Sequence, residues 1–474
     1  MMVVEVDMPG VRWVRGRFDH RGAMKYNGLW TDRGAAFITM GEKKGLIIAY
    51  DIIGPYMAGP GLRSLRLAEA LSAALPVDIL IGPESEPVKD SPVQFVAAPS
   101  QGDEKSFLEN YKVCLASSTF PLTNPWLLEA DIPLAVDCYC PYVLENLFLY
   151  HDKSVEDARF QHERHLKAQI EALLRADIVL CASPRQRDLF TGALMALNRL
   201  NPAPTSVVDE NKLIALVPFG LEERDPPPRG GVRGRVPGYA PDDEVLIWGG
   251  GIWEWFDPLS LIGAVNELRY KRPNIRLHFL GAKHPNMHIP FPAKAKEAIA
   301  LAAKLGIKDK HVFFGDWVAV AERGKYLRDA DLGVSFHRVG FETRYSFRTR
   351  LMDYIWAELP MVVSAGDDLS GELASEGIAE ALPDNSPAVI ADAISSWLDR
   401  VGDHRGSFTE KFALLKQRYR WSRVAQPLME FFVKPYSTSG VRGEGFFQAH
   451  LGGLNPAGRP GIIARLIDRI LRGK

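Results

Sequence analysis

The segment GLIIAYDII (Gly45–Ile53) decides the fold, because it is a continuous apolar run of strand length. Strands buried on both faces of a parallel sheet have this composition. A Gly/Pro loop follows it, and LRSLRLAEALSAAL (Leu62–Leu75) then carries apolar residues at helical spacing. VDILIG (Val77–Gly82) is the next strand. Strand, helix and strand in this order predict a doubly wound parallel sheet.

The same alternation occurs twice along the chain. It runs to ADIVLCAS (Ala176–Ser183), stops at EERDPPPRGGVRGRVPGYAP (Glu222–Pro241) and restarts at EVLIWGG (Glu244–Gly250). The interruption is dense in Pro, Gly and Arg, a composition typical of a linker. The expected fold class is therefore α/β, with two doubly wound, Rossmann-like domains facing across a cleft. Because ligands bind outside the carboxyl ends of parallel strands, the cleft is the expected site.

Composition excludes several classes of protein. The chain has 474 residues and a formal net charge of -1, which gives no support for nucleic-acid binding. Its 4 cysteines are too few for a disulfide framework at this length, and we expect buried thiols. Neither a secretory signal nor an apolar run of membrane-spanning length is found, so we expect a cytoplasmic protein.

The first loop of interest follows the first strand. Gly59 and Gly61 lie there, and Arg63 and Arg66 come in the first turns of the next helix. Glycines allow a ligand to approach the backbone, and a helix N-terminus offers free N–H groups. We expect Gly59, Gly61 and Arg63 to bind the ligand; the alternative is a plain tight turn.

The second loop is GGGIWEWFDP (Gly249–Pro258), again between a strand and a helix. Three successive glycines favour close passage of a phosphate or a sugar past the backbone at Gly250 and Gly251. Trp253 and Trp255 could stack on a base or a sugar ring. The alternative for both is a place in the hydrophobic core.

The third loop is GFETRYSFRTRLMDYIWAELP (Gly340–Pro360), which leads from a strand into a helix. Arg344, Arg348 and Arg350 lie within seven residues of one another near the expected N-terminus of that helix. Cations are unfavourable at that end unless an anion is bound there, and a diphosphate would be such an anion. The alternative is a solvated basic face.

The same helix supplies further candidate ligand-binding groups. We expect it to begin at Ser346, so that the backbone N–H groups of Ser346 and Phe347 contact the diphosphate. Asp353 lies about two turns further on and could accept hydrogen bonds from ribose hydroxyls. Alternatively, Asp353 forms a salt bridge with Arg350 three residues before it.

Together these segments resemble the GT-B glycosyltransferases, particularly the family-4-like retaining enzymes, over residues 45–434. The resemblance rests on the order and spacing of five stretches: GPGLRSLRLAEALS (Gly59–Ser72), ADIVLCASPRQRDLF (Ala176–Phe190), LVPFGLE (Leu216–Glu222), YLRDADLGVSF with AELPMVVSAG (Tyr326–Phe336 and Ala357–Gly366), and RYRWSRVAQPLMEFF (Arg418–Phe432).

The resemblance implies a domain layout and an activity. The layout is an extension at 1–44, an acceptor domain at 45–225, a nucleotide-sugar domain at 226–420, a helix crossing back at 421–436 and a tail at 437–474. The activity is transfer of a sugar from a nucleotide-sugar donor to a glycan or lipid-linked glycan acceptor, with retention of configuration, as in polysaccharide biosynthesis. The implied co-substrate is the nucleotide sugar, with no cofactor and no metal.

Catalytic roles follow from the same resemblance. Asp137, which ends a strand of the first domain, could orient an acceptor hydroxyl; alternatively it caps a turn. Relatives place two glutamates eight residues apart at the donor helix, whereas here the second position is Asp353. Glu342 could take the role of the first. The pair Asp367–Asp368 is the nearest approach to a metal-binding acidic motif, and we expect it to begin a helix.

One departure from the family's pattern leaves room for other functions. Relatives hold the diphosphate with an Arg and a Lys in the loop that here reads GGGIWEWFDP. We expect Arg344, Arg348 and Arg350 to substitute for them. The alternatives are a catalytically silent scaffold that binds a glycan or a partner enzyme, and a sugar-nucleotide epimerase.

The C-terminal segment GIIARLIDRILRGK (Gly461–Lys474) has an apolar stripe at helical spacing opposite a basic face. Such a helix can lie in the headgroup layer of an anionic membrane, which would make the protein peripheral at the inner membrane face. The alternative is packing on the protein's own surface or on a second subunit.

Overall fold

The computed structural model describes residues 43–438 except 151, 202–212, 285 and 287–288, together with the strands β1 (Arg17–Phe18) and β2 (Met24–Lys25). The chain divides into two compact units, Met1–Lys44 and Gly45–Lys474. In the first, β1 and β2 pair antiparallel. The expected amphipathic helix at 461–474 lies outside the described residues.

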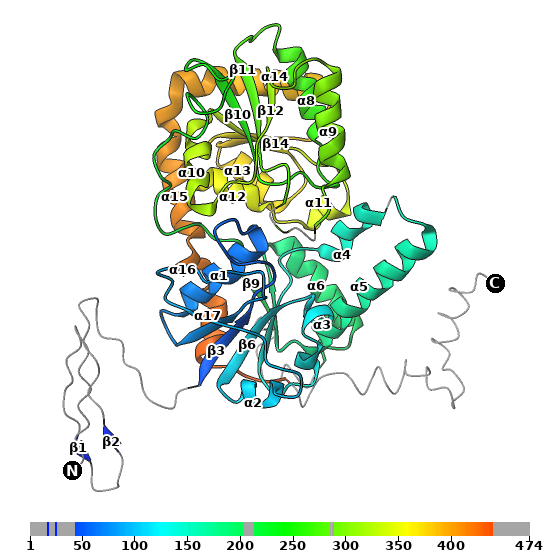
Figure 1. Ribbon diagram of the computed structural model, residues 1–474, viewed down its shortest axis with the longest axis vertical. Helices are drawn as coiled ribbons and strands as arrows, with labels where there is room; N and C mark the ends of the chain where they lie inside the picture. Colours follow the sequence, from blue (N-terminus) through cyan, green and yellow to red (C-terminus); the bar gives the residue numbers. More distant parts are fainter. Residues whose placement is uncertain are drawn as a thin grey trace. The chain divides into compact units, whose positions relative to one another are not determined.

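The second unit contains two parallel sheets, each covered by helices (Figure 1). The first sheet has the order β5-β4-β3-β6-β7-β8-β9. Its strands are β3 (Lys44–Ile48), β4 (Val77–Leu80), β5 (Gln94–Val96), β6 (Tyr111–Ser117), β7 (Leu134–Asp137), β8 (Ile178–Cys181) and β9 (Ile214–Leu216). Its helices are α1 (Gly59–Leu71), α2 (Glu104–Leu108), α3 (Phe120–Thr123), α4 (Tyr142–Glu145), α5 (Val155–Arg175) and α6 (Pro184–Ala196), with 3₁₀ turns η1 (Pro125–Leu128) and η2 (Asn146–Tyr150).

The second sheet has the order β12-β11-β10-β13-β14-β15. Its strands are β10 (Glu244–Gly249), β11 (Ile275–Leu280), β12 (Val312–Phe314), β13 (Leu332–Ser335), β14 (Met361–Ser364) and β15 (Ala379–Leu382). Its helices are α8 (Pro258–Leu268), α9 (Ala293–Lys304), α10 (Val320–Asp329), α11 (Phe341–Tyr345), α12 (Thr349–Trp356), α13 (Asp368–Ser375), α14 (Pro387–His404) and α15 (Thr409–Tyr419), with the 3₁₀ turn η4 (Arg405–Phe408). The prediction of two doubly wound sheets is confirmed.

The end of the described chain returns to the first sheet as two short helices, α16 (Trp421–Val424) and α17 (Gln426–Val433), where the sequence suggested one (Figure 1). A Cβ on Gly45 in β3 would lie 2.7 Å from the Phe432 ring, so glycine is needed for this close packing. Thr438, expected in a loose tail, is buried and donates its backbone N–H to Asp177.

Tyr354 fixes helix α12 against the second sheet. Its hydroxyl lies 3.0 Å from the Ile247 carbonyl oxygen and 2.9 Å from that of Val334, and it accepts the Gly249 N–H at 3.0 Å. Gly333 makes room for the tyrosine ring, which lies 2.6 Å from where a Cβ would be. The N-terminus of α12 is thereby held beside the loop that follows β10.

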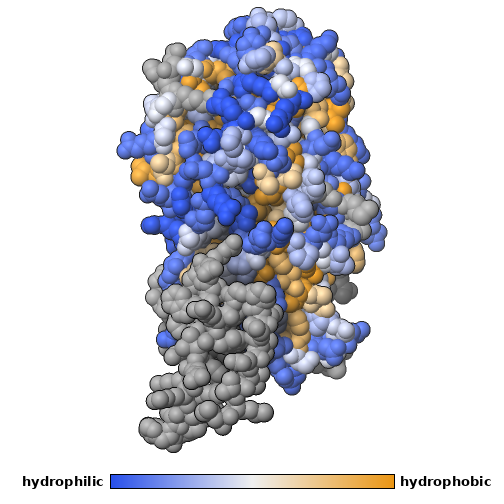
Figure 2. All heavy atoms as spheres, turned by 60° about the vertical axis from the view of Figure 1, so that its left-hand side comes forward, coloured by the Kyte–Doolittle hydropathy of each residue, from blue (hydrophilic) through white to orange (hydrophobic). Residues whose placement is uncertain are grey.

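The cysteines agree in part with the expected buried thiols in strands, because Cys138 and Cys140 follow β7. All four cysteines are free; Cys140 is half-buried and the other three are buried. Within residues 43–438, as far as they are described, no helix is long and apolar enough to cross a membrane. Hydrophilic side chains cover most of the described face shown in Figure 2, and hydrophobic ones gather in smaller patches.

Candidate active site

A cavity of ≈ 520 Å³ lies between the two sheets. Its lining comes from the segments that follow β3, β7 and β9 in the first sheet and β10, β11, β12 and β13 in the second. These are the carboxyl ends of parallel strands, where open α/β sheets bind ligands. Direct bonds join its two walls: Val320 N–H donates to the Pro55 carbonyl at 2.8 Å, and the Gln186 amide to the Tyr345 carbonyl at 2.7 Å.

Arg350 holds the glycine loop in place. Its guanidinium donates to the carbonyls of Gly249 and Gly251, the latter at 2.7 Å, and to Ser335 Oγ at 3.1 Å. It also lies 4.3 Å from the centre of the Trp248 ring. Burial lowers the pKa of Arg350 to about 10, which leaves it charged at neutral pH. Arg350 lines the cavity, but each of its three nitrogens already has an acceptor, so we assign it to the support of the loop and not to the diphosphate clamp that we expected.

Three of the four predicted glycines line the cavity and one does not. Gly59, Gly250 and Gly251 line the cavity, and Gly250 has a φ of 82°, which disfavours other residues. Gly61 does not line it; a Cβ there would lie 2.4 Å from the Ile52 carbonyl oxygen. Gly61 therefore allows a tight turn, the alternative that the sequence left open.

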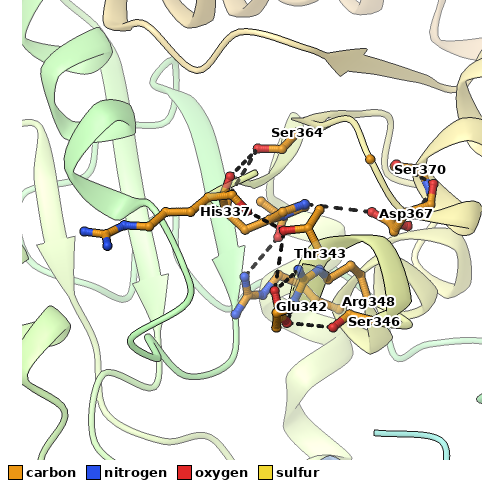
Figure 3. Close-up of polar contacts among 12 residues, drawn as sticks. His337, Glu342, Thr343, Ser346, Arg348, Ser364, Asp367 and Ser370 are labelled. Carbon is orange, nitrogen blue, oxygen red and sulfur yellow. Dashed lines mark hydrogen bonds and ion pairs between the residues drawn. The ribbon is translucent and has the colours of Figure 1, made fainter. Parts of the chain in front are cut away.

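Arg348 and Glu342 form a buried ion pair (Figure 3). Arg348 donates from both terminal nitrogens to Glu342 at 2.8 Å each, and Ser346 Oγ donates to the same carboxylate at 2.6 Å. Arg348, Ser346 and Phe347 line the cavity, whereas Glu342 does not. Glu342 therefore holds Arg348 in place, whereas the sequence suggested a catalytic role for it.

The donor helix begins later than expected. Helix α12 starts at Thr349 with Arg348 as its N-cap, so Ser346 and Phe347 precede it. Arg344 lies in the preceding short helix α11, is exposed and does not line the cavity. The prediction that Arg344 joins the clamp is corrected, because its side chain points to solvent beside Tyr345.

Two further buried polar residues, His337 and Asp367, lie near Arg348. His337 Nε2 is 4.0 Å from Asp367 Oδ2 (Figure 3). Burial, with Arg348 and Arg350 nearby, lowers the pKa of His337 well below its usual value, so the ring is neutral. Asp367 caps α13 by accepting the Ser370 N–H at 2.8 Å, as the sequence predicted for this acidic pair.

Asp353 is paired with Arg323 at 3.0 Å, and both side chains line the cavity. The alternative pairing with Arg350 is not formed, because Arg350 is engaged by the glycine loop. Burial raises the pKa of Asp353, and Arg323 opposes that shift. Arg323 was not predicted as a site residue. Its position in α10, the helix that follows β12, was the feature of the sequence that could have indicated it.

Aromatic rings form one wall of the cavity. Trp253 and Trp255 stack with ring centroids 5.6 Å apart, His284 lies 5.5 Å from Trp253, and Trp317 lies 5.1 Å from His284. All four line the cavity, so the tryptophans are not solely core residues. His284 and Trp317 were missed, although each follows the end of a strand.

Arg63 and Asp137 pair with each other beneath the cavity. Arg63 donates to the two carboxylate oxygens at 2.6 and 2.9 Å, and also to the carbonyls of Val217 and Pro218. Neither side chain lines the cavity. The expected contacts of Arg63 with the ligand and of Asp137 with an acceptor hydroxyl are corrected, because each side chain is occupied by the other.

The first sheet supplies further polar side chains to the cavity, among them Tyr50, Asp51 and Glu145. Asp51 lies 4.0 Å from His284 of the opposite wall. Burial raises the pKa of Glu145 to about 8. Within the described residues, no three His, Cys, Asp or Glu side chains are grouped as metal ligands.

Comparison with known proteins supports the fold. No protein-family model matches the chain, and no match is found among curated proteins. Solved structures do match. Sucrose-phosphate synthase from Thermosynechococcus elongatus is 15% identical with a TM-score of 0.57, covering 82% of this chain and 98% of that one. WaaG, a glycosyltransferase of lipopolysaccharide biosynthesis, is 12% identical with a TM-score of 0.55, covering 82% and 100%.

A third similar structure is Anabaena HepE in complex with UDP-glucose, at 13% identity and a TM-score of 0.55, covering 82% of this chain and 99% of that one. At these identities the likeness concerns the fold. The chain has the GT-B architecture, which confirms the prediction drawn from the resemblance.

Proposed function

We propose that this protein is a glycosyltransferase that moves a sugar from a nucleotide-sugar donor to a glycan or lipid-linked glycan acceptor, with retention of configuration. One observation carries the proposal. Arg323 and Arg348 line one cavity beside the N-terminus of α12, at the carboxyl edge of the second sheet. Two guanidiniums and a helix N-terminus together favour a diphosphate.

Both arginines keep donors beyond their ion pairs. A guanidinium has five N–H donors. Glu342 accepts two hydrogen bonds from Arg348, and Asp353 contacts one nitrogen of Arg323. The remaining donors, with the first N–H groups of α12, would stabilise the charge that develops on the leaving diphosphate. This proposal replaces the predicted clamp of Arg344, Arg348 and Arg350 with Arg323 and Arg348.

The rest of the cavity suits the other parts of a donor. Asp353, one helical turn inside α12, would accept hydrogen bonds from the ribose hydroxyls. Gly250 and Gly251 would let the sugar or the diphosphate approach the backbone. The aromatic wall of Trp253, Trp255, His284 and Trp317 offers ring faces for stacking. Similar structures bound to UDP and UDP-glucose support a nucleotide-sugar donor.

Release of nucleoside diphosphate from a panel of UDP-, GDP- and ADP-sugars tests the proposal. We expect slow hydrolysis of at least one donor, and faster release when its acceptor is added. Arg323→Ala should lower that release, and Arg344→Ala, at an exposed position outside the cavity, should leave it unchanged. If the folded protein binds and hydrolyses none of these donors, a silent scaffold is the better account.

A sugar-nucleotide epimerase is the second candidate, because the cavity contains groups suited to proton transfer, namely His284, Asp51 and Glu145. Its product would be a nucleotide sugar with one inverted hydroxyl. Chromatography of donor incubated without acceptor separates the two activities: an epimer indicates the second candidate, and free nucleoside diphosphate indicates the transferase.

We also propose that residues 461–474 contact an anionic membrane, which would bring the cavity near a lipid-linked acceptor. The basic amphipathic pattern supports this proposal. Flotation with anionic liposomes should recover more full-length protein than protein ending at Pro460. Equal recovery of the two would show that the tail has another role.

A further inference from the structure

Glu145 has an unusual place in the cavity. It is the last residue of α4 and belongs to the first-sheet wall, while Ser346 and Arg348 belong to the opposite wall. Helix α4 packs against α11, which carries Glu342. Within the described part of the chain, the Glu145 carboxyl makes no hydrogen bond and no ion pair. The Glu145 carboxyl therefore lines the cavity without forming an ion pair.

The cation that acts on Glu145, Arg348, is already paired with another carboxylate. Arg348 is bound by Glu342 through two hydrogen bonds of 2.8 Å, so the pair carries no net charge. Burial raises the pKa of Glu145 to about 8; the negative Glu342 adds to the shift and Arg348 opposes it. An ionised carboxyl without a partner is disfavoured at this half-buried place, which favours the protonated form.

Four other titratable groups around Glu145 have pKa values that are shifted away from the interval between pH 7 and 9. From its own wall, burial raises the pKa of Tyr50 and of Cys140 well above their usual values. From α5, which packs against α4, burial lowers the pKa of His165. Across the cavity, burial lowers the pKa of His284. Comparison with a Glu145→Gln variant then assigns proton binding in this interval to Glu145.

We propose, on the basis of the proposed function, that Glu145 binds the donor as a neutral carboxylic acid and donates its proton in a hydrogen bond to a diphosphate oxygen. A diphosphate brings negative charge to a place where Arg348 offers hydrogen-bond donors but Glu342 offsets its charge. Ionised Glu145 would repel it, whereas protonated Glu145 supplies a donor at the wall opposite Arg348. No proton is transferred; the carboxyl keeps it while the ligand is bound.

The affinity for UDP, the nucleotide bound in Anabaena HepE, tests the proposal. If the protonated form alone binds UDP, the apparent affinity follows the protonated fraction, which falls about tenfold between pH 7 and 9. We expect a fall of about that size in calorimetric titrations of the full chain. The matched control is Glu163→Gln, an exposed position on α5 outside the cavity, which should show the same fall.

Glu145→Gln should bind UDP with nearly constant affinity over this interval, because an amide donates at every pH. The unchanged protein should also take up a proton on binding near pH 8.5, measured as a dependence of the binding heat on the buffer's ionisation enthalpy. Binding of UDP without proton uptake, or a fall that persists in Glu145→Gln, overturns the proposal and leaves the transferase intact. Failure to bind UDP, GDP or ADP at any pH counts against the proposed function itself.

Stability without ligand gives an independent test. Between about pH 5 and 8 the unfolded Glu145 is ionised while the folded one holds its proton. The protein should therefore lose stability relative to Glu145→Gln as the pH rises through this interval, and no further above it. A constant difference between the two melting temperatures would contradict a proton held at Glu145.

Discussion

Replacing Arg348 by alanine should affect stability and ligand binding separately. Glu342 is 2% exposed and Arg348 6% exposed, so the variant leaves a buried carboxylate whose remaining hydrogen-bond donors are the hydroxyls of Ser346 and, at 3.5 Å, Thr343. Breaking a buried ion pair from one side costs about 3–5 kcal/mol. Loss of a charge-assisted hydrogen bond to the diphosphate adds about 1.5–3 kcal/mol of binding free energy, or roughly a ten- to hundredfold weaker affinity for UDP.

The double variant Glu342→Gln/Arg348→Ala separates these effects. It removes the unpaired charge, so urea denaturation should recover most of the stability lost in Arg348→Ala, while UDP binding should stay weak. Arg344→Ala, four residues earlier and exposed, should change stability by less than about 0.5 kcal/mol. Recovery of UDP affinity in the double variant, or full stability of Arg348→Ala, would refute the reasoning.

Two further substitutions test other side chains. Asp353→Ala should weaken UDP binding and leave inorganic diphosphate binding unchanged in calorimetry, because Asp353 is assigned to the ribose; equal losses for both ligands would make the residue structural. Asp137→Asn should lower the free energy of unfolding by about 3 kcal/mol or more, because it leaves buried Arg63 without its carboxylate. The affinity for UDP below the melting temperature should not change. Weaker binding of UDP with unaltered stability would indicate that Asp137 contacts the ligand.

The fold could be predicted from the sequence because strands and helices are indicated by hydrophobic patterns within short segments. Apolar runs such as Gly45–Ile53 identify buried parallel strands, and the Pro/Gly-rich interruption at Glu222–Pro241 separates the two alternating regions. The sequence locates the ends of helices less precisely than it locates the helices themselves. Ser346 resembles a helix start, yet α12 begins at Thr349; the Ser346 hydroxyl donates to buried Glu342 and accepts no backbone N–H of the helix.

The site was predicted only in part, because partners across the cavity lie far apart in sequence. The loops after β10 and before α12 were correctly expected to meet. Sequence could not show that Arg350 would bind the carbonyls of Gly249 and Gly251, 101 and 99 residues away. Nor could it pair Arg63 with Asp137, 74 residues apart. Arg323 and Glu145 were missed because neither belongs to a recognisable sequence motif. Each is identified as a site residue by the residues that face it across the cavity.

The most direct test of the account is a crystal structure of the protein with UDP bound. The account predicts diphosphate oxygens within hydrogen-bonding distance of the guanidiniums of Arg323 and Arg348, at the start of α12, with the ribose on Asp353. UDP bound elsewhere on the protein, or a cavity that stays empty at saturating UDP, would contradict it.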